Sequence, residues 1–324
     1  MDWKSTRIDA LLEQALIEDQ AVRDATTNLT IDPDLRAAAS ILARQDLVVS
    51  GLGAVPRLLE IFARLDARPD TKHHAHPQSQ TRFEVISHPE IFDGVRVHAG
   101  QVLAVIRHNA RVLLSCERVI LNLLQHLSGI ATLTRTYVDT IAGTHARVLD
   151  TRKTVPGLRA LEKYAVQCGG GTNHRIDLAS GILVKNNHIS LGGGIPTVLT
   201  KALEKRHRGQ RIQVEVRNAR ELEEALKFGA EAILLDNMTP LQVKLSVDRI
   251  KEAAAAKTPS AGVAAGDAAP VDEHRWIPTE ASGGIVLENI RAYALAGVDF
   301  ISVGALTHSA KAADISMRIT AESR

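Results

Sequence analysis

The chain has 324 residues, of which 45% are apolar and only 3% aromatic, and its formal net charge is +2. This length allows one large core, or a barrel with a smaller domain beside it. The near-neutral charge, without a long basic block beside aromatic residues, argues against a nucleic-acid-binding surface.

Cysteine usage and hydropathy bear on the compartment of the protein. Cys116 and Cys168 lie far apart and lack metal-ligand spacing, so we expect free thiols in a reducing compartment. Cys168 is interpreted as a packed thiol rather than a nucleophile. The N-terminal segment lacks the apolar core of a signal peptide, and no apolar stretch is long enough to span a bilayer. We therefore expect a soluble, cytoplasmic protein with no membrane partner.

In chain order, the first predicted element is a helix over residues 1–20, where apolar residues recur at helical spacing. Short β-like runs follow at three places, as in an α+β domain: 37–53, 82–88 and 101–108. The segment of residues 68–81 is expected to form an exposed loop or insertion. Its three histidines are weak evidence for a metal site, because no carboxylate or cysteine stands at ligand spacing beside His73, His74 and His76.

The longest helical pattern covers residues 115–143, and Ser128-Gly129 is expected to bend or interrupt it. Arg118 lies near the start of this helix, and the periodicity alone predicts that its side chain is solvated. Beyond this helix, apolar strand candidates alternate with helical patterns, which indicates a parallel sheet covered by helices. The strands are 146–150, 181–185, 212–216, 232–236, 277–281 and 299–303, and the helices are 157–166, 195–207, 219–228, 240–255 and 286–296. Residues 253–275, rich in Ala, Gly and Pro, are expected to form a flexible insertion without chemistry of its own.

Polar residues or glycines stand at the end of each strand candidate. In a β/α barrel the active site lies at the C-terminal ends of the strands. A doubly wound open sheet would gather its ligands at a single switch point. The repeated polar endings therefore favour a β/α barrel.

The densest group of basic side chains lies between the first two of these strands, beside the glycines of segment 168–175. Its members are Arg152, Lys153, His174, Arg175 and Lys185. Cations at strand ends suit a small substrate with several negative charges, and surface salt bridges are the alternative. Glu215 and Asp236 end adjacent strands, where they can hold a divalent metal, bind ribose hydroxyls, act as acid and base, or only close salt bridges.

Glycine-rich turns follow the last two strands. Ser282, Gly283 and Gly284 form one turn, and Gly304 with the nearby His308 forms the other. Backbone N–H groups at such turns bind phosphate in barrel folds. Neither a Walker-type loop nor a G-x-G-x-x-G motif after a strand occurs. These residues predict a phosphorylated, polyanionic substrate.

Several long blocks stand in a fixed order: ERVILNLLQHLSGIAT, DTRKTVPGLR, EKYAVQCGGGTNHR, LVKNNHI, VEV, LLDN, EASGGI and SVGALTHSA. Together they resemble the family of nicotinate-nucleotide pyrophosphorylase (carboxylating), also called quinolinate phosphoribosyltransferase. The similarity runs from about residue 8 to the C-terminus and is densest between residues 115 and 190.

The resemblance implies a fold and a reaction. The fold is an N-terminal α/β sandwich over residues 1–118, joined by C-terminal helices, and an incomplete, seven-stranded β/α barrel over 119–324. The reaction joins quinolinate and phosphoribosyl pyrophosphate, with Mg²⁺, to give nicotinate mononucleotide, pyrophosphate and CO₂ in NAD biosynthesis. A head-to-tail homodimer with shared active sites is also implied, and higher oligomers stay open.

The resemblance also implies residue roles. Arg152, His174, Arg175 and Lys185 match the family's quinolinate-binding positions, and Arg118 matches the residue contributed by the neighbouring chain. Lys153, Glu215 and Asp236 match the catalytic positions that bind phosphoribosyl pyrophosphate, and the two carboxylates match the metal positions. The 5′-phosphate region is matched by Ser282, Gly283, Gly284, Gly304 and His308.

The chain departs from the family pattern at two positions, because Asn186 and Arg217 stand where acids are common. One alternative function is a paralogous phosphoribosyltransferase that acts on another base. Another is a Schiff-base barrel aldolase that uses Lys185. A phosphosugar-binding regulator without turnover is the third.

Overall fold

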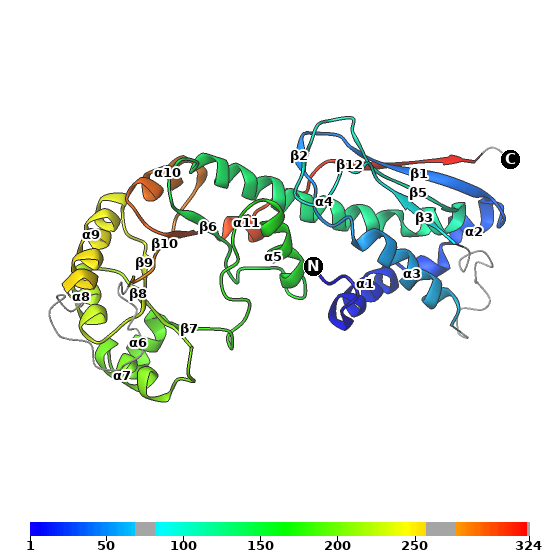
Figure 1. Ribbon diagram of the computed structural model, residues 1–324. Coiled ribbons are helices and arrows are strands. Elements are labelled where there is room, and N and C mark those ends of the chain that lie inside the picture. Colours follow the sequence, from blue (N-terminus) through cyan, green and yellow to red (C-terminus); the bar gives the residue numbers. More distant parts are fainter. Residues whose placement is uncertain (69–81, 257–275, 323–324) are drawn as a thin grey trace, which may run out of the picture. The chain divides into compact units, whose positions relative to one another are not determined.

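The computed structural model describes residues 1–68, 82–256 and 276–322 and divides the chain into two compact units. The first unit is built from three segments, 1–135, 154–170 and 306–324, and the second from 136–153 and 171–305. The units do not follow the boundary expected between residues 118 and 119. Helix α4 (Ala110–Thr140) runs through that position as one continuous element (Figure 1).

The first unit contains a four-stranded antiparallel sheet with the order β12-β1-β5-β3. Its strands are β1 (Arg36–Ala43), β3 (Glu84–Ile86), β5 (Val102–Asn109) and β12 (Ile315–Ala321). Buried and less buried side chains alternate along β1, so one face of the sheet covers the core. Strand β12 stands where C-terminal helices were expected. It pairs with β1 along its whole length, because its seven residues can extend the ladder that β1 leaves open.

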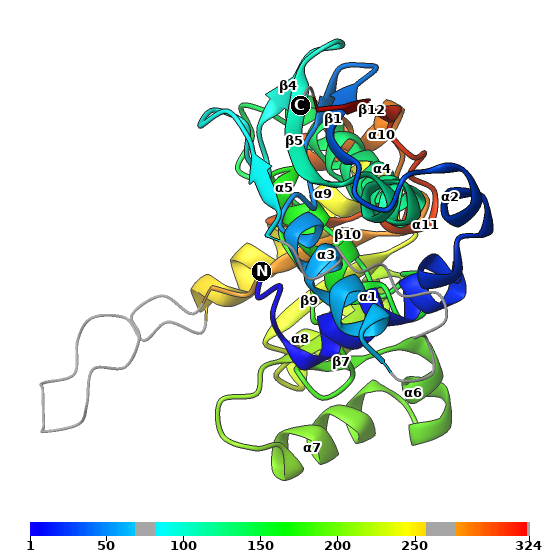
Figure 2. The same ribbon diagram turned by 90° about the vertical axis from the view of Figure 1, so that its right-hand side faces the viewer.

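Helices lie beside this sheet; α4 runs along it in Figure 1 and is seen nearly end-on in Figure 2. The remaining helices are α1 (Thr6–Glu18), η1 (Ala21–Arg23), α2 (Ala25–Thr30), α3 (Ala54–Asp66), α5 (Arg159–Cys168) and α11 (Ala305–His308), which begins at the last residue of the second unit. A small antiparallel ribbon joins β2 (Leu47–Val48) to β4 (Arg96–Val97). The predicted first helix is confirmed as α1, whereas α3 was not predicted.

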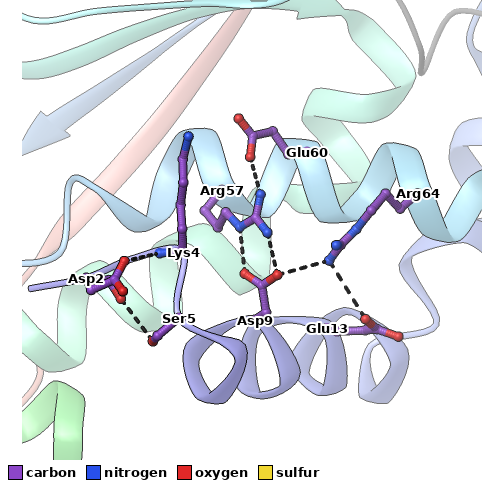
Figure 3. A network of polar contacts seen from close by, with 8 residues as sticks. All are labelled: Asp2, Lys4, Ser5, Asp9, Glu13, Arg57, Glu60 and Arg64. Carbon is purple, nitrogen blue, oxygen red and sulfur yellow. Dashed lines mark hydrogen bonds and ion pairs between the residues drawn. The ribbon is translucent and has the colours of Figure 1, made fainter.

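Polar contacts link α1 to α3 (Figure 3). Both guanidinium arms of Arg57 on α3 bind acidic groups, namely Asp9 on α1 and Glu60 one turn away. Arg64, further along α3, reaches Asp9 and Glu13 at 3.5 and 4.0 Å. Around these contacts the apolar faces of the two helices pack together and bury side chains such as Leu12 and Phe62.

Ser128-Gly129 does not interrupt α4, contrary to the prediction. A Cβ atom on Gly129 would lie 2.1 Å from the carbonyl oxygen of Lys311, so glycine allows the backbone of the C-terminal segment to approach the helix. The Ser128 hydroxyl is buried and bonds the N–H and C=O of Ser50. Both residues therefore serve packing. Although α4 has 31 residues, none of the described helices is apolar enough over sufficient length to cross a membrane.

The second unit contains a six-stranded parallel sheet with the order β6-β11-β10-β9-β8-β7. The strands are β6 (Arg147–Leu149), β7 (Ile182–Val184), β8 (Ile212–Val216), β9 (Ala232–Asp236), β10 (Thr279–Ser282) and β11 (Phe300–Ser302). The helices are α6 (Asn186–Gly192), α7 (Ile195–Lys205), α8 (Ala219–Lys227), α9 (Pro240–Ala256) and α10 (Leu287–Leu295). The predicted α/β class with parallel strands is confirmed.

Two predicted insertions fall largely outside the described residues. Residues 69–81, which include the three histidines, and residues 257–275 lie outside the described part of the chain. The start of the second insertion was wrongly predicted, because residues 253–256 continue α9. The run of alanines there favours a helix more strongly than a loop. Cys116 and Cys168 are free, and burial raises the pKa of the Cys168 thiol, which fits a packed thiol.

Candidate active site

The C-terminal edge of the parallel sheet in the second unit carries most of the predicted site residues. Arg152 and Lys153 follow β6, Lys185 follows β7, and Gly304 follows β11. Glu215 lies near the end of β8. Asp236 and Ser282 end β9 and β10 and face each other in register. Parallel strands end at the same edge, so the fold gathers these groups on one side of the sheet.

Three hydrogen bonds hold His174. Its backbone N–H donates to Oδ1 of the buried Asp150 at 2.8 Å. Its ring Nδ1 accepts the backbone N–H of Arg175 at 2.7 Å. Its ring Nε2 lies 3.3 Å from Oε2 of Glu280. Because Nδ1 accepts a hydrogen bond it carries no proton there, and Nε2 is the protonated nitrogen that donates to the carboxylate.

Glu280 is a buried carboxylate that sequence reasoning missed. It lies on β10 with only 3% of its surface exposed. Besides His174, its oxygens accept hydrogen bonds from Gln213 Nε2 at 2.7 Å and from the Ser302 hydroxyl. Burial acts to raise the pKa of Glu280, but the hydrogen bond and electrostatic attraction of His174, followed by the hydrogen bonds from Ser302 and Gln213, outweigh it and hold the pKa below its usual value. The only sequence signal is a charged residue inside an apolar strand.

Arg152 and Arg175 are placed near each other. Burial and then the positive charge of Arg152 lower the pKa of Arg175. One amino group of Arg175 donates to the Gly181 carbonyl at 2.9 Å, which fixes the side chain. Two guanidinium groups that repel each other are stabilised by an anion between them, so this pair is suited to bind carboxylates.

Lys185 and Glu215 form an ion pair across β7 and β8. The ammonium nitrogen lies 3.7 Å from Oε2 of Glu215, and half of the lysine side chain is exposed. The other carboxylate oxygen accepts the N–H of Asn186 at 3.3 Å. The backbone N–H of Lys185 donates to Nδ1 of His188 in the first turn of α6. Both side chains are thus oriented before any ligand binds.

Asp236 lies beside the first glycine turn. Its Oδ2 accepts the side-chain amide of Asn237 at 2.9 Å, and the N–H of Asn237 donates to the Ser282 carbonyl at 2.8 Å. Gly283 has a φ of +95°, and a Cβ there would lie 2.3 Å from the Asn237 side-chain oxygen. Glycine is therefore required at this turn both by its backbone conformation and by space.

Arg217, one of the two departures from the family pattern, follows β8. Glu221 accepts its backbone N–H and one guanidinium N–H, both at 2.8 Å. The side-chain hydrogen bond and the charge of Glu221, followed by the charges of Glu215 and Asp236, raise the pKa of Arg217. The departure therefore adds an anchored cation beside the two carboxylates.

The other predicted residues are placed as follows. Lys153 is exposed, and its backbone N–H donates to the Thr151 hydroxyl at 3.0 Å. Arg118 and His308 belong to the first unit. Arg118 is 57% exposed and lies 3.7 Å from Glu117 on α4, and His308 ends α11 with its ring 2.6 Å from the Ser309 hydroxyl.

The carboxylates Glu215 and Asp236 fit a Mg²⁺ ion that is shared with a substrate. Within the described ranges no three His, Cys, Asp or Glu side chains gather as a metal-binding group. Mg²⁺ is commonly held by one or two carboxylates together with waters and substrate phosphates. The donor set is therefore suitable for such an ion and too small for an all-protein metal cage.

Comparisons with known proteins indicate the same family along most of the chain. Residues 24–128 match the family model for the N-terminal domain of quinolinate phosphoribosyl transferase, and residues 130–318 match the model for its C-terminal domain. A nicotinate-nucleotide pyrophosphorylase (carboxylating) of Mycobacterium leprae is 35% identical over 94% of this chain and 95% of its own. The chloroplastic enzyme of the same name from Arabidopsis thaliana is 35% identical over 97% and 83%. The crystal structure of NadC from Streptococcus pyogenes covers both chains fully at 33% identity, with a TM-score of 0.80.

Proposed function

Because this chain belongs to the quinolinate phosphoribosyltransferase family, we propose that its active site lies at the C-terminal edge of the parallel sheet in the second unit. The chain is a phosphoribosyltransferase of NAD biosynthesis. It transfers the phosphoribosyl group of phosphoribosyl pyrophosphate to quinolinate, with loss of CO₂, and forms nicotinate mononucleotide and pyrophosphate.

Quinolinate is assigned to the neighbourhood of Arg152 and Arg175. The observation that carries this assignment is the partly buried guanidinium of Arg175, which the Gly181 carbonyl fixes and whose pKa is lowered by burial and then by the nearby charge of Arg152. Quinolinate is a dianion, and a guanidinium group can bind a carboxylate with two parallel hydrogen bonds. Lys185, half exposed beside Glu215, supplies a further cation at the same edge. His174 belongs to this group of residues through its contact with Arg175.

Phosphoribosyl pyrophosphate is assigned to the opposite part of the edge, over β8 to β11. Glu215 and Asp236 would hold Mg²⁺ together with the substrate, and the ion would offset the negative charge of the pyrophosphate. Lys153 and Arg217 supply cations for the same group. The turns at Ser282, Gly283, Gly284 and Gly304, together with His308, would take the 5′-phosphate through N–H donors.

Catalysis at this site needs no covalent nucleophile. The fixed cations orient the pyridine ring so that its nitrogen lies near the anomeric carbon of the ribose, and positioning of this kind can supply a large part of the rate. Cations around the departing pyrophosphate stabilise the charge that develops on it. After transfer, the positive charge of the quaternary ring nitrogen can stabilise the carbanion that loss of CO₂ leaves on the adjacent carbon, until that carbon takes up a proton from water.

The proposal extends to the shape of the second unit. The strands pair in unbroken parallel order from β6 to β7, and Thr172 forms a parallel bridge with Leu149 on the free side of β6. We propose that this segment is the seventh strand of an incomplete barrel whose gap lies between Thr172 and β7. An experimental structure with a flat sheet would contradict this.

A homodimer with shared active sites is also proposed, with Arg118 donated by the neighbouring chain. Its support is the exposure of Arg118 on α4 and the family pattern around it. Mixing Arg118→Ala subunits with Arg175→Ala subunits should restore part of the activity. No recovery in a verified mixed dimer would place Arg118 in the site of its own chain.

A cytoplasmic location is proposed from the two free cysteines, and cell fractionation tests it.

The test of function is release of pyrophosphate and CO₂ from quinolinate, phosphoribosyl pyrophosphate and Mg²⁺, with nicotinate as the decoy base. Equal release with quinolinate alone supports the assignment, and turnover of nicotinate instead would favour a paralogous enzyme. Arg152→Ala and Lys185→Ala should raise the KM for quinolinate far more than that for phosphoribosyl pyrophosphate. Arg249→Ala, in a surface pair with Glu223, is the control and should change neither KM.

A further inference from the structure

Three hydrogen-bond donors converge on the carboxylate of Glu280 from three different parts of the chain. They are the ring Nε2 of His174 at 3.3 Å, the amide of Gln213 on β8 at 2.7 Å and the hydroxyl of Ser302 on β11. Glu280 itself is 3% exposed. A buried carboxylate that accepts several hydrogen bonds is fixed in position, because any rotation would leave polar groups unpaired.

His174 passes this constraint on to Arg175. One ring nitrogen donates to Glu280 and the other accepts the backbone N–H of Arg175 at 2.7 Å. Both ring nitrogens are therefore engaged within the protein. In this geometry neither ring nitrogen is left to bind a substrate.

We propose that Glu280 and His174 are positioning residues, which act on quinolinate by fixing the backbone of Arg175. This inference rests on the proposed function, in which Arg175 binds a carboxylate of quinolinate. Glu280 selects the tautomer of His174 with its proton on Nε2, and this leaves Nδ1 as the acceptor for Arg175. Asp150 holds the backbone of His174 at the same time, at 2.8 Å. A guanidinium group binds a carboxylate well only where its backbone is placed correctly.

In this arrangement His174 and Gln213 donate to one oxygen of Glu280, and the Ser302 hydroxyl donates to the other. Glutamine can reproduce this pattern, because its side-chain oxygen can face His174 and Gln213 while its amide nitrogen donates to the Ser302 hydroxyl, which can also accept. Leucine offers no acceptor, so the Nε2 proton of His174 loses its partner, and the tautomer with Nδ1 as the acceptor for Arg175 is no longer favoured. Glu280→Leu is therefore expected to raise the KM for quinolinate by about 5- to 30-fold and to leave that for phosphoribosyl pyrophosphate within about twofold, whereas Glu280→Gln should keep both KM values closer to those of the unaltered enzyme.

The matched control is Glu231→Leu. Glu231 also lies in the second unit and accepts hydrogen bonds from the Ile212 N–H and Arg206, at the N-terminal ends of the strands. A merely structural effect of losing a hydrogen-bonded carboxylate would appear in both variants as lower stability, without a split between the two KM values.

Two substitutions at position 174 separate positioning from direct binding. The side-chain oxygen of asparagine stands close to where Nδ1 of histidine stands, so His174→Asn keeps an acceptor for Arg175, whereas His174→Ala does not. The proposal expects the KM for quinolinate to be at least about fivefold lower in His174→Asn than in His174→Ala. Equal values in the two variants would mean that His174 acts through its own ring and would overturn the proposal.

A measurement on the unaltered enzyme avoids any folding defect in the variants. ¹⁵N NMR of histidine-labelled protein, with His174 identified from the spectrum of His174→Asn, reports which ring nitrogen carries the proton. The expected result is a neutral ring protonated at Nε2, both without and with quinolinate. A ring that is charged, or protonated at Nδ1, would refute the inference even while quinolinate turnover upholds the function. Absence of quinolinate turnover would instead refute the function.

Discussion

The ring Nε2 of His126 on α4 lies 2.9 Å from Oε1 of Glu162 on α5, and the Glu162 side chain is fully buried. The other oxygen of this carboxylate accepts the N–H of Val155 at 3.2 Å. One buried group therefore connects two helices to the segment that follows Thr154 in the first unit. A buried carboxylate is stabilised only as far as its partners compensate for lost hydration.

Removal of the His126 imidazole should lower the stability of the fold. His126→Ala removes the hydrogen-bond partner of one Glu162 oxygen and is expected to lower the free energy of unfolding by about 1–3 kcal/mol. Urea denaturation at pH 7 measures this. His145→Ala is the control, because that ring is 59% exposed and lies 3.9 Å from Asp299. A loss at His126 no larger than at His145 would show that Glu162 finds other compensation.

The pair of Asp9 and Arg57 predicts a pH dependence. The hydrogen bond from Arg57 holds the pKa of Asp9 below its usual value, so the unfolded chain takes up a proton at Asp9 more readily than the folded one. The contribution of the pair is complete above the unfolded pKa of about 3.9 and is lost as pH falls through the folded pKa. A double-mutant cycle of Asp9→Asn and Arg57→Ala should give a coupling of about 0.5–1 kcal/mol at pH 7, because solvent screens the pair. The same cycle at pH 3 should give less, and equal coupling at both pH values would contradict the ion pair.

The three tyrosines predict a loss of stability in alkali. Burial raises the pKa values of Tyr137, Tyr164 and Tyr293, and for Tyr164 the hydrogen bond to Asp93 at 2.7 Å adds to it. A raised folded pKa stabilises the fold below the unfolded pKa of about 10 and ceases to do so as pH rises further. Ultraviolet titration should show little tyrosinate in the folded protein at pH 10. About half of the tyrosines should be ionised at the same pH in guanidinium chloride, and identical curves would contradict the prediction.

The two adjacent glycines after β10 should differ in their tolerance of alanine. Gly283→Ala places a Cβ 2.3 Å from the Asn237 side-chain oxygen at a φ of +95°, whereas Gly284 has a φ of +63° with open space around it. A φ near +60° is an allowed left-handed conformation that costs alanine about 1–2 kcal/mol, and the strained Gly283 should cost more. Thermal unfolding of the two variants compares them directly. A Gly284→Ala protein as unstable as Gly283→Ala would show that the contact with Asn237 is unimportant.

Strand periodicity predicted the sheet of the second unit well, because parallel strands buried on both faces are nearly continuous apolar runs. β8 and β9 have the predicted limits. β10 begins two residues later than predicted, after Pro278, since proline has no N–H for the ladder. Helix α3, which begins directly after the predicted β-like run 37–53, was not predicted; it contains Pro56, which is tolerated in the first turn of a helix.

The candidate site was predictable only where residue type and strand position coincide. Lysine and arginine at strand ends, and Glu215 and Asp236 beside them, satisfy that condition. Glu280 does not, because its partners Gln213, Ser302 and His174 come from three distant segments, and only the folded sheet shows that all are donors to one carboxylate. The hydrogen bond from the Arg175 N–H to the His174 ring could not be predicted either, because it depends on the local backbone conformation.

Pairing of β12 with β1 has a consequence for the order in which this protein is made. The ribosome releases β1 early, but the strand that covers its edge is synthesised only after the whole of the second unit. Until then the nascent first unit exposes an unpaired strand edge, a state that favours wrong association of polypeptides. Completion of the first unit therefore requires that the second unit has already been synthesised, so the second unit can begin folding first.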